Sequence, residues 1–363
     1  MPRCLRVGFA LALVALVVTG CGQGLPTWST RTVPNGINML NDVVCPSTTQ
    51  CYAVGGDGTA GPGSIIGSSD GGDHWQLLMT TPQVQLLAIA CSDSGTCVVG
   101  GEANSTFAAE KPQVFLTRDH GAHWSRETLP PLGGVDGAAC SSVTVCLIIG
   151  GRAIARTTNG GMTWVTERTP TDLAEIDSVA CPTRSFCIVG GTGSSPSLPG
   201  PSANSVSQDA GATWSKAVVV SGPIHTGGGN VVESGLGAVS CSGPQNCVGV
   251  SQSPTFASLG NGSPSVTSDG GSEWTRGSGT VGGALSCIAN LCVSVGGRWR
   301  GPDTTYLNLV GAAYVSTDGG VDWSRSRIPT RRVLTAVSCP SSTHCVAVGG
   351  DFLEQPAVIL TDS

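Results

Sequence analysis

Two short stretches decide the fold: VVCPSTTQCYAVGG at residues 43–56 and SSDGGDHW at residues 68–75. The first places two cysteines between two apolar runs, which predicts a hairpin of two β-strands joined at the cysteines. The second is a Gly-rich turn followed by a tryptophan, which predicts a second hairpin. Together they indicate a unit of four consecutive strands.

The cysteine hairpin recurs along the whole chain. Seven pairs occur, six with five residues between the cysteines and one with four: Cys45 and Cys51, Cys91 and Cys97, Cys140 and Cys146, Cys181 and Cys187, Cys241 and Cys247, Cys287 and Cys292, Cys339 and Cys345. From Cys45 to Cys339 the chain runs 294 residues in six steps, a mean period of 49. Four strands in a unit of this length are typical of one β-propeller blade.

The second motif recurs in the frame Ser/Thr-x-Asp-x-Gly-x-x-Trp. Six copies carry these residues at the third position: Asp70, Asp119, Asn159, Asp209, Asp269 and Asp318. In such a turn the side chain accepts hydrogen bonds from backbone N–H groups, the Gly takes a positive φ and the Trp returns over the core. The motif resembles the Asp box, or bacterial neuraminidase repeat, of sialidase-like β-propellers. We therefore expect these six residues to be structural.

The two ends of the chain fit into one unit. The last apolar segment, residues 358–361, stops inside a turn motif, and PTWST at residues 26–30 is typical of an outermost strand. We expect the N-terminal strand to complete the C-terminal blade. The prediction is an all-β, seven-bladed propeller of four-stranded antiparallel blades over residues 26–363. A β-helix or open solenoid is the alternative, but its repeats are shorter and its ends need caps.

The N-terminal segment is predicted to direct export. Two arginines precede an apolar run at residues 7–18, which is too short to span a bilayer and is typical of a signal peptide. The run ends in VTGC at residues 18–21, which resembles the bacterial lipobox. That resemblance implies cleavage after residue 20 and a lipid on Cys21. An ordinary secretory signal with an incidental cysteine is the alternative.

This reading divides the chain into a lipoprotein signal peptide (1–20), a lipidated linker (21–25) and the propeller (26–363). We expect the mature protein on the extracytoplasmic side of a bacterial cell membrane, held there by the lipid on Cys21. Lys and Arg number 18 against 24 Asp and Glu, a net charge of −6. A general nucleic-acid binder is excluded by this balance, because neutralising phosphates requires a dense positive surface.

Cysteine usage indicates an oxidising compartment. Of the sixteen cysteines, fourteen remain in local pairs once Cys4 and Cys21 are set aside. We predict that each of the seven pairs forms a disulfide at the base of its hairpin. Zinc or redox sites are the alternative, but zinc needs further ligands, and the five histidines follow no period. We expect no metal and no cofactor.

The repeat also predicts two unlike faces. The turn of the Ser/Thr-x-Asp-x-Gly-x-x-Trp motif is called the Asp-type turn below. It lies at the same ends of the strands as the cysteine turn, on what we call the constant face. The connections between second and third strands, and those between blades, lie on the opposite, variable face, and they differ in length. Ligands commonly bind such variable loops.

One basic and aromatic group falls on the variable face. It consists of Arg298, Trp299, Arg300, Tyr306, Arg331 and Arg332. Such a group is typical of recognition of an anion, a sugar or an acidic protein patch. The alternative is a solvated loop whose Trp packs on a neighbouring blade.

Catalytic residues do not transfer from the families that the turns resemble. Sialidases need an arginine triad, a Tyr–Glu pair and an Arg-Ile-Pro motif near the N-terminus, whereas Arg327-Ile328-Pro329 follows the sixth turn here. Xyloglucanase-type glycosidases use a pair of acidic residues in the cleft. The acids expected near the variable face are Asp42, Asp57, Glu102, Asp136, Asp177 and Asp351, and the sequence does not pair any two of them at the separation that glycoside hydrolysis requires.

The chain also resembles the photosystem II stability/assembly factor family in having a single seven-bladed ring on an exported protein without a catalytic set. That resemblance implies protein binding through an arginine-bearing face, although paired cysteines in every blade depart from the family. We expect a monomeric, membrane-anchored binding or assembly scaffold that recognises a protein or glycan and has no catalytic activity. The alternative is an exo-acting, sialidase-like glycoside hydrolase.

Overall fold

The computed structural model describes residues 26–56, 62–92, 95–103, 112–195, 200–221, 224–225, 231–232, 235–252, 262–299, 309–350 and 356–362. The predicted signal peptide, Cys21, Arg300 and Tyr306 therefore lie outside the described residues. No helix among the described residues is long and apolar enough to cross a membrane.

Seven four-stranded antiparallel sheets make up the fold, and each is one blade. Blades 1 to 3 are β2 (Met39–Val44), β3 (Cys51–Gly56), β4 (Gly63–Ser68), β5 (Gln76–Thr81); β6 (Val84–Cys91), β7 (Cys97–Ala103), β8 (Pro112–Thr117), β9 (Ser125–Glu127); and β10 (Gly137–Cys140), β11 (Cys146–Gly150), β12 (Ala153–Thr157), β13 (Val165–Glu167). Blades 4 and 5 are β14 (Leu173–Ala180), β15 (Cys187–Gly193), β16 (Ser202–Ser207), β17 (Val218–Ser221); and β20 (Gly235–Cys241), β21 (Cys247–Gln252), β22 (Ser263–Thr267), β23 (Thr275–Arg276).

Blades 6 and 7 complete the set. Blade 6 is β24 (Ala284–Ile288), β25 (Leu291–Trp299), β26 (Leu309–Ser316), β27 (Ser324–Ser326), and blade 7 is β28 (Val333–Ser341), β29 (His344–Gly350), β30 (Val358–Asp362), β1 (Trp28–Arg31). A small hairpin, β18 (Ile224–His225) and β19 (Val231–Val232), lies in the connection between blades 4 and 5. The predicted seven-bladed all-β propeller is confirmed.

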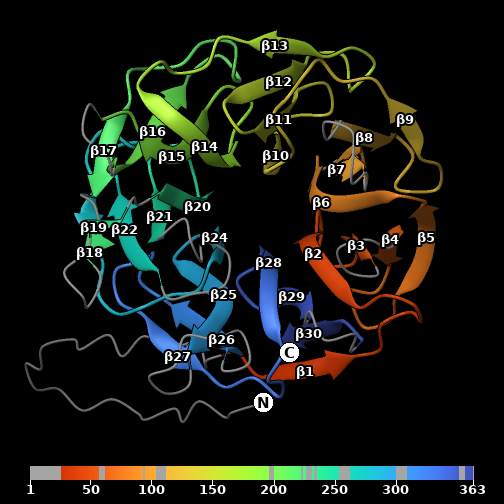
Figure 1. The fold of residues 1–363 in the computed structure, drawn as a ribbon. Helices are drawn as coiled ribbons and strands as arrows, with labels where there is room; N and C mark the ends of the chain where they lie inside the picture. Colours follow the sequence, from red (N-terminus) through yellow and green to blue (C-terminus); the bar gives the residue numbers. More distant parts are fainter. Residues whose placement is uncertain are drawn as a thin grey trace, which may run out of the picture.

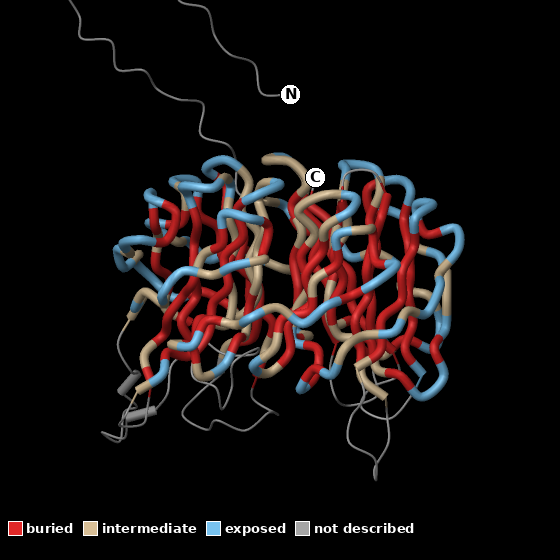
Figure 2. Tube along the Cα trace, turned by 90° about the horizontal axis from the view of Figure 1, so that it is seen from above, coloured by how far each residue is buried: buried red, intermediate tan, exposed pale blue. Residues whose placement is uncertain are grey.

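The blades form a closed ring around a central channel (Figure 1). The first strand of each blade faces the centre, and the fourth strand lies at the outer edge. Seen from the side, the molecule is a disc whose strands run between two faces, with the buried residues in its middle (Figure 2). Both predicted turns of each blade therefore lie on one face of the disc.

Ring closure follows the predicted route. Strand β1 pairs antiparallel with β30, with Trp28 opposite Asp362 and Arg31 opposite Ile359. Trp28 is 6% exposed and packs among apolar side chains of blades 6 and 7, including Val293 and Leu360. The N-terminal strand thus supplies the fourth strand of blade 7 and the aromatic side chain that fills its junction with blade 6.

Apolar side chains between neighbouring blades form the core. One cluster joins Ala53 and Ile66 of blade 1 with Val346 and Ile359 of blade 7, and comparable clusters recur around the ring. Because each blade is apolar on both sides, its strands have near-continuous buried runs, as in β3, which is buried at every residue.

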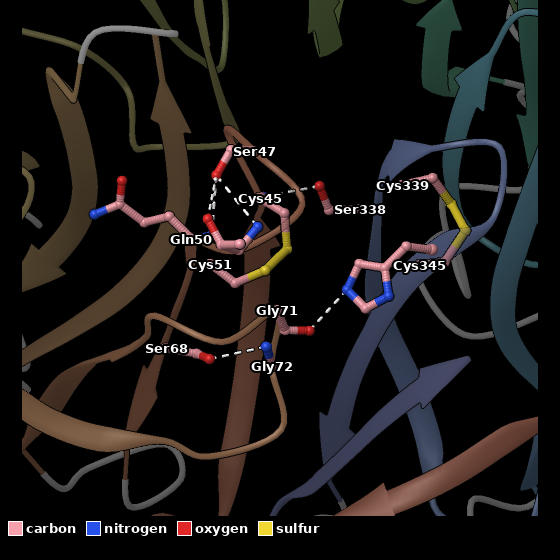
Figure 3. Close-up of a disulfide and its surroundings, with 12 residues drawn as sticks. Cys45, Ser47, Gln50, Cys51, Ser68, Gly71, Gly72, Ser338, Cys339 and Cys345 are labelled. Atoms are coloured by element: carbon pink, nitrogen blue, oxygen red, sulfur yellow. Dashed lines mark hydrogen bonds between the residues drawn. A yellow bond between two sulfur atoms is a disulfide. The ribbon is translucent and has the colours of Figure 1, made fainter. Parts of the chain in front are cut away.

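Each predicted cysteine pair is bonded in the structure. The Cα–Cα distances are 4.0–4.1 Å in all seven disulfides. Figure 3 shows Cys45–Cys51 beside Cys339–Cys345 of the neighbouring blade. The Ser338 hydroxyl accepts a hydrogen bond from the Cys45 N–H at 2.9 Å, which joins blade 7 to blade 1.

The Asp-type turns have the hydrogen bonds that their sequence predicted. In blade 1 the Asp70 carboxylate accepts the N–H of His74 at 2.9 Å, and this bond is the main reason that the pKa of Asp70 falls to about 2. The Ser68 hydroxyl donates to Asp70 at 2.8 Å and accepts the Gly72 N–H at 2.8 Å. The Trp75 indole donates to the Gly72 carbonyl, which holds the ring over the core.

Two consecutive residues of each turn have positive φ. The predicted glycine has φ near 90°, as at Gly72 (93°) and Gly320 (95°). The residue before it is also left-handed, and it is glycine in four copies but His120 (58°) and Ala210 (57°) in the other two. The sequence frame did not reveal this second position, because L residues adopt this conformation at a modest energetic cost.

Replacing the turn hydroxyl tests how much one turn stabilises the ring. Ser207 is 1% exposed, donates to Asp209 at 2.8 Å and accepts the Gly211 N–H at 2.8 Å. Ser207→Ala leaves that N–H buried without a partner, so we expect a loss of about 1–3 kcal/mol in the free energy of unfolding. Ser207→Thr is the matched control, because Thr occupies this position in three turns. Equal denaturation midpoints for the two variants would contradict this role.

Candidate functional site

The central channel of the ring holds a cavity that every blade lines. It is a cavity of about 670 Å³, lined by the first strands of all seven blades. A volume of this size is in the range of ligand pockets.

A bulge repeats along the channel wall. In five blades the first strand has one extra residue four positions before its first cysteine: Asn41, Leu87, Asp177, Gly237 and Thr335. In blades 3 and 6 the same place in the sequence is held by Asp136 and Gly283. All seven residues except Leu87 are polar or glycine, and all line the cavity. In those five blades the bulge thus turns one residue toward the axis.

Acidic side chains collect on one side of this ring. Asp136 of blade 3 and Glu175 and Asp177 of blade 4 line the cavity, and no ion pair within 4.0 Å joins any of them to a described basic residue. The Asp136 carboxylate accepts the Gly151 N–H at 2.6 Å. Burial, followed by the negative charges of Glu175 and Asp136, raises the pKa of Asp177 to about 7. No described basic residue therefore pairs directly with the cluster.

Two other acids of the sequence-based set have structural partners. Asp42 accepts the N–H groups of Val43 and of Ile89 in the next blade, both at 2.8 Å, while burial raises its pKa to about 7. Glu102 accepts the Val135 N–H at 2.9 Å. Both side chains bridge neighbouring blades. Asp57 and Asp351 lie outside the described residues.

The structure separates members of the predicted basic group. Along β25, Val293 and Val295 pack with blade 7, so strand alternation directs Arg298 to the opposite side, toward blade 5. Arg332 is half-buried, and its guanidinium donates to the Ala357 carbonyl of blade 7 at 3.2 Å. Arg331 is exposed.

The remaining members of that group are not placed in detail. Trp299 ends β25, with its side chain outside the described residues, and Arg300 and Tyr306 lie outside them entirely. The described part of the group therefore divides between two sides of blade 6.

Sequence reasoning named the channel residues Asp42, Asp136 and Asp177 but missed most of the others. Glu175, Gly235 and Gln252 were not singled out, although the first lies six positions before Cys181 and the second six before Cys241. Aligning all blades on their first cysteine identifies the channel-lining positions, since the bulge repeats at a constant offset. Gln252 carries no such signal, because it ends the second strand of blade 5.

Comparison with known proteins identifies an architecture. No protein-family model and no curated protein sequence matches the chain. Among solved structures, YCF48 bound to D1 peptide is 14% identical with a TM-score of 0.58, covering 94% of this chain and 97% of that one. YCF48 from Cyanidioschyzon merolae is 14% identical with a TM-score of 0.57, covering 92% and 98%.

Enzymes with the same architecture also match. The GH74 enzyme from Niastella koreensis is 12% identical with a TM-score of 0.57, and the match covers 90% of this chain but 54% of the enzyme. This chain thus spans about half the length of that enzyme. At these identities the likeness shows the propeller fold.

Proposed function

We propose that this protein is an Asp-box lipoprotein that binds a protein or glycan partner through its variable face. It acts as an extracytoplasmic binding or assembly scaffold, as a monomer, and has no catalytic activity. The observation that carries this proposal is the difference between the two faces of the disc.

The constant face repeats one geometry. Its cysteine turns are closed by disulfides of nearly equal Cα–Cα distance. On the other face, the connection between second and third strands has two residues in blade 3 and ten in blade 5, between Gln252 and Ser263. Loops that vary while the scaffold is constant are typical of recognition surfaces.

The position of the N-terminal strand supports the same orientation. Trp28 enters blade 7 opposite Asp362, in the way that Trp75 follows the turn of blade 1, so the chain reaches β1 on the constant face. Four residues lie between Cys21 and Pro26, a reach of less than about 20 Å. A lipid on Cys21 would hold the constant face toward the bilayer and leave the variable face accessible.

The comparisons add support of two kinds. A propeller of the same architecture, YCF48, has been solved bound to D1 peptide, which favours a protein partner for the present ring. The GH74 neighbours favour the alternative, a glycoside hydrolase, for which Asp136 and Asp177 are two of the acids that line the channel.

Photo-crosslinking tests which face binds. A photoreactive phenylalanine analogue is placed at Arg152 or Arg331 on the variable face, and at Val143 or Met162 on the constant face; all four positions are exposed. In the native host we expect specific adducts from the first two positions. Adducts from the constant face alone would overturn the proposal.

Two further measurements test the anchor and the lack of chemistry. Metabolic labelling with an alkyne fatty acid should mark the wild type and fail to mark Cys21→Ala, which should also leave the membrane fraction. A fluorogenic glycoside screen should give no turnover. Turnover that is lost in Asp136→Asn and Asp177→Asn would favour the hydrolase instead.

A further inference from the structure

Three glycines of blades 5 and 6 line the channel wall beside the acidic cluster. The bulge residue of blade 5 is Gly237, and Gly283 holds the same place in the sequence of blade 6; around the ring they follow Asp136 of blade 3 and Asp177 of blade 4. At Gly235 a Cβ would lie 2.4 Å from Asp177 Oδ2. Neither Gly235 nor Gly237 has a positive φ. Glycine at these two positions therefore leaves room beside the neighbouring side chains, and no positive φ requires it.

A second, independent feature of this wall is an unmet hydrogen-bond acceptor. Gln252 lines the cavity, is 4% exposed, and its Oε1 has no hydrogen-bond partner. Its Nε2 donates to the Gly283 carbonyl at 3.0 Å, which fixes the orientation of the amide because a reversed amide would bring two oxygens together. The Gln252 amide lies beside Gly237, where a Cβ would be 3.3 Å from its carbon and 3.6 Å from Oε1.

Gln252 Oε1 and the carboxyl groups of Asp177 and Glu175 all accept hydrogen bonds. No described residue donates a hydrogen bond to the carboxyl group of Asp177 or Glu175. Glu175 is exposed, whereas Asp177 is partly buried, and burial makes a carboxyl group costly without a partner. A ligand that satisfies them must donate from several directions and carry positive charge. Guanidinium has five N–H donors and ammonium has three.

We propose that the recess between blades 4 and 6 binds one cationic side chain, arginine or lysine, presented by an exposed segment of a partner polypeptide. This proposal rests on the proposed function, because the recess is reached from the variable face. Strands β14 and β20 begin on that face, and Glu175 and Gly235 lie near their first residues. The charged group lies against Asp177 and Glu175, its N–H donors reach toward Gln252 Oε1, and its alkyl stem passes over Gly235 and Gly237. Charge-assisted hydrogen bonds of this kind are among the stronger ones in proteins.

Peptide selection tests the ligand chemistry directly. A phage-displayed library of random dodecapeptides is panned against the disulfide-bonded propeller, and the selected peptide is then measured by fluorescence anisotropy. We expect arginine or lysine to be enriched at one position. Replacing that arginine by citrulline, or that lysine by norleucine, should weaken binding at least tenfold.

Variants of the protein locate the site. Asp177→Asn and Glu175→Gln should each weaken the selected peptide about tenfold, and Glu175 is exposed, so its replacement leaves folding intact. Glu273→Gln is the matched control: this acid is exposed on the constant face, and its loss should leave the affinity unchanged within about twofold. Melting temperatures of all three variants report whether each is folded.

Each other outcome overturns the inference. Selected peptides without a required cation, no enriched cationic peptide at all, or equal affinity for wild type and Asp177→Asn would do so. Agmatine that competes as well as the peptide would show a site for small free cations and not for a polypeptide. If the selected peptides lack a cation but partner crosslinks form at Arg331, this inference fails and the proposed function stands. If crosslinks form only at Val143, the proposed function itself fails.

Discussion

Complete reduction of the seven disulfides is expected to lower the melting temperature by about 15–20 °C. Each disulfide joins cysteines that are five or six positions apart in the sequence. The unfolded-chain entropy that it removes is worth about 2 kcal/mol. Seven such contributions sum to on the order of 10 kcal/mol, comparable with the whole stability of an ordinary domain. Dividing this free energy by an unfolding entropy of about 2 cal/mol/K per residue gives the expected fall in melting temperature of about 15–20 °C.

Differential scanning calorimetry with and without reductant measures the effect. Mass spectrometry after alkylation must show fourteen modified cysteines in the reduced sample. The double variant Cys181→Ala and Cys187→Ala is the graded control, and it should lose only about one seventh of the total shift. A fully alkylated protein with an unchanged melting temperature would show that the bridges contribute nothing to stability.

Trp28→Ala should be the most destabilising single substitution at the ring closure. The indole is 6% exposed, packs with blades 6 and 7, and donates from Nε1 to the Ser326 hydroxyl at 3.2 Å. Removing a buried Trp leaves a cavity that costs about 3–5 kcal/mol. The cavity also lies where residues from opposite ends of the chain pack together, so β1 loses its main anchor.

Urea denaturation checks this effect against an exposed residue. Val219→Ala on β17 is the control, because this side chain is 59% exposed and should change stability by less than about 0.5 kcal/mol. Deleting residues 26–31 should go further and expose the edge of β30 to pairing with another chain. Equal stability of Trp28→Ala and Val219→Ala would mean that β1 does not hold the ring closed.

Much of the fold could be predicted because its signals are local. The cysteines of each hairpin lie five or six positions apart, and the hydroxyl, carboxylate and glycine of each turn lie within five residues. Ring closure was also predictable, since an unpaired PTWST segment at residues 26–30 matches the strand that the last unit lacks. The second left-handed residue of the turns was missed, because His120 and Ala210 give no sign of it.

The candidate sites show where this reasoning ends. Arg298 and Arg332 fall in one group by sequence, yet strand alternation directs Arg298 toward blade 5, while Arg332 donates to blade 7. Asp42 and Asp177 are alike as lone acids, but only Asp42 receives two backbone N–H groups. The direction of a side chain and its partners on other blades decide between a structural bridge and an unmet acceptor.

The sequence by itself determined the blade, the number of blades, the bridges and the closing strand, because hydrogen bonds of turns and covalent links act over a few residues. Only the tertiary structure decided which side chains meet in the channel. Asp177, Gly237 and Gln252 come together there because seven twisted sheets close into a ring and bring the bulge of one blade against the next. That arrangement depends on contacts between whole blades, which no short stretch of the chain encodes.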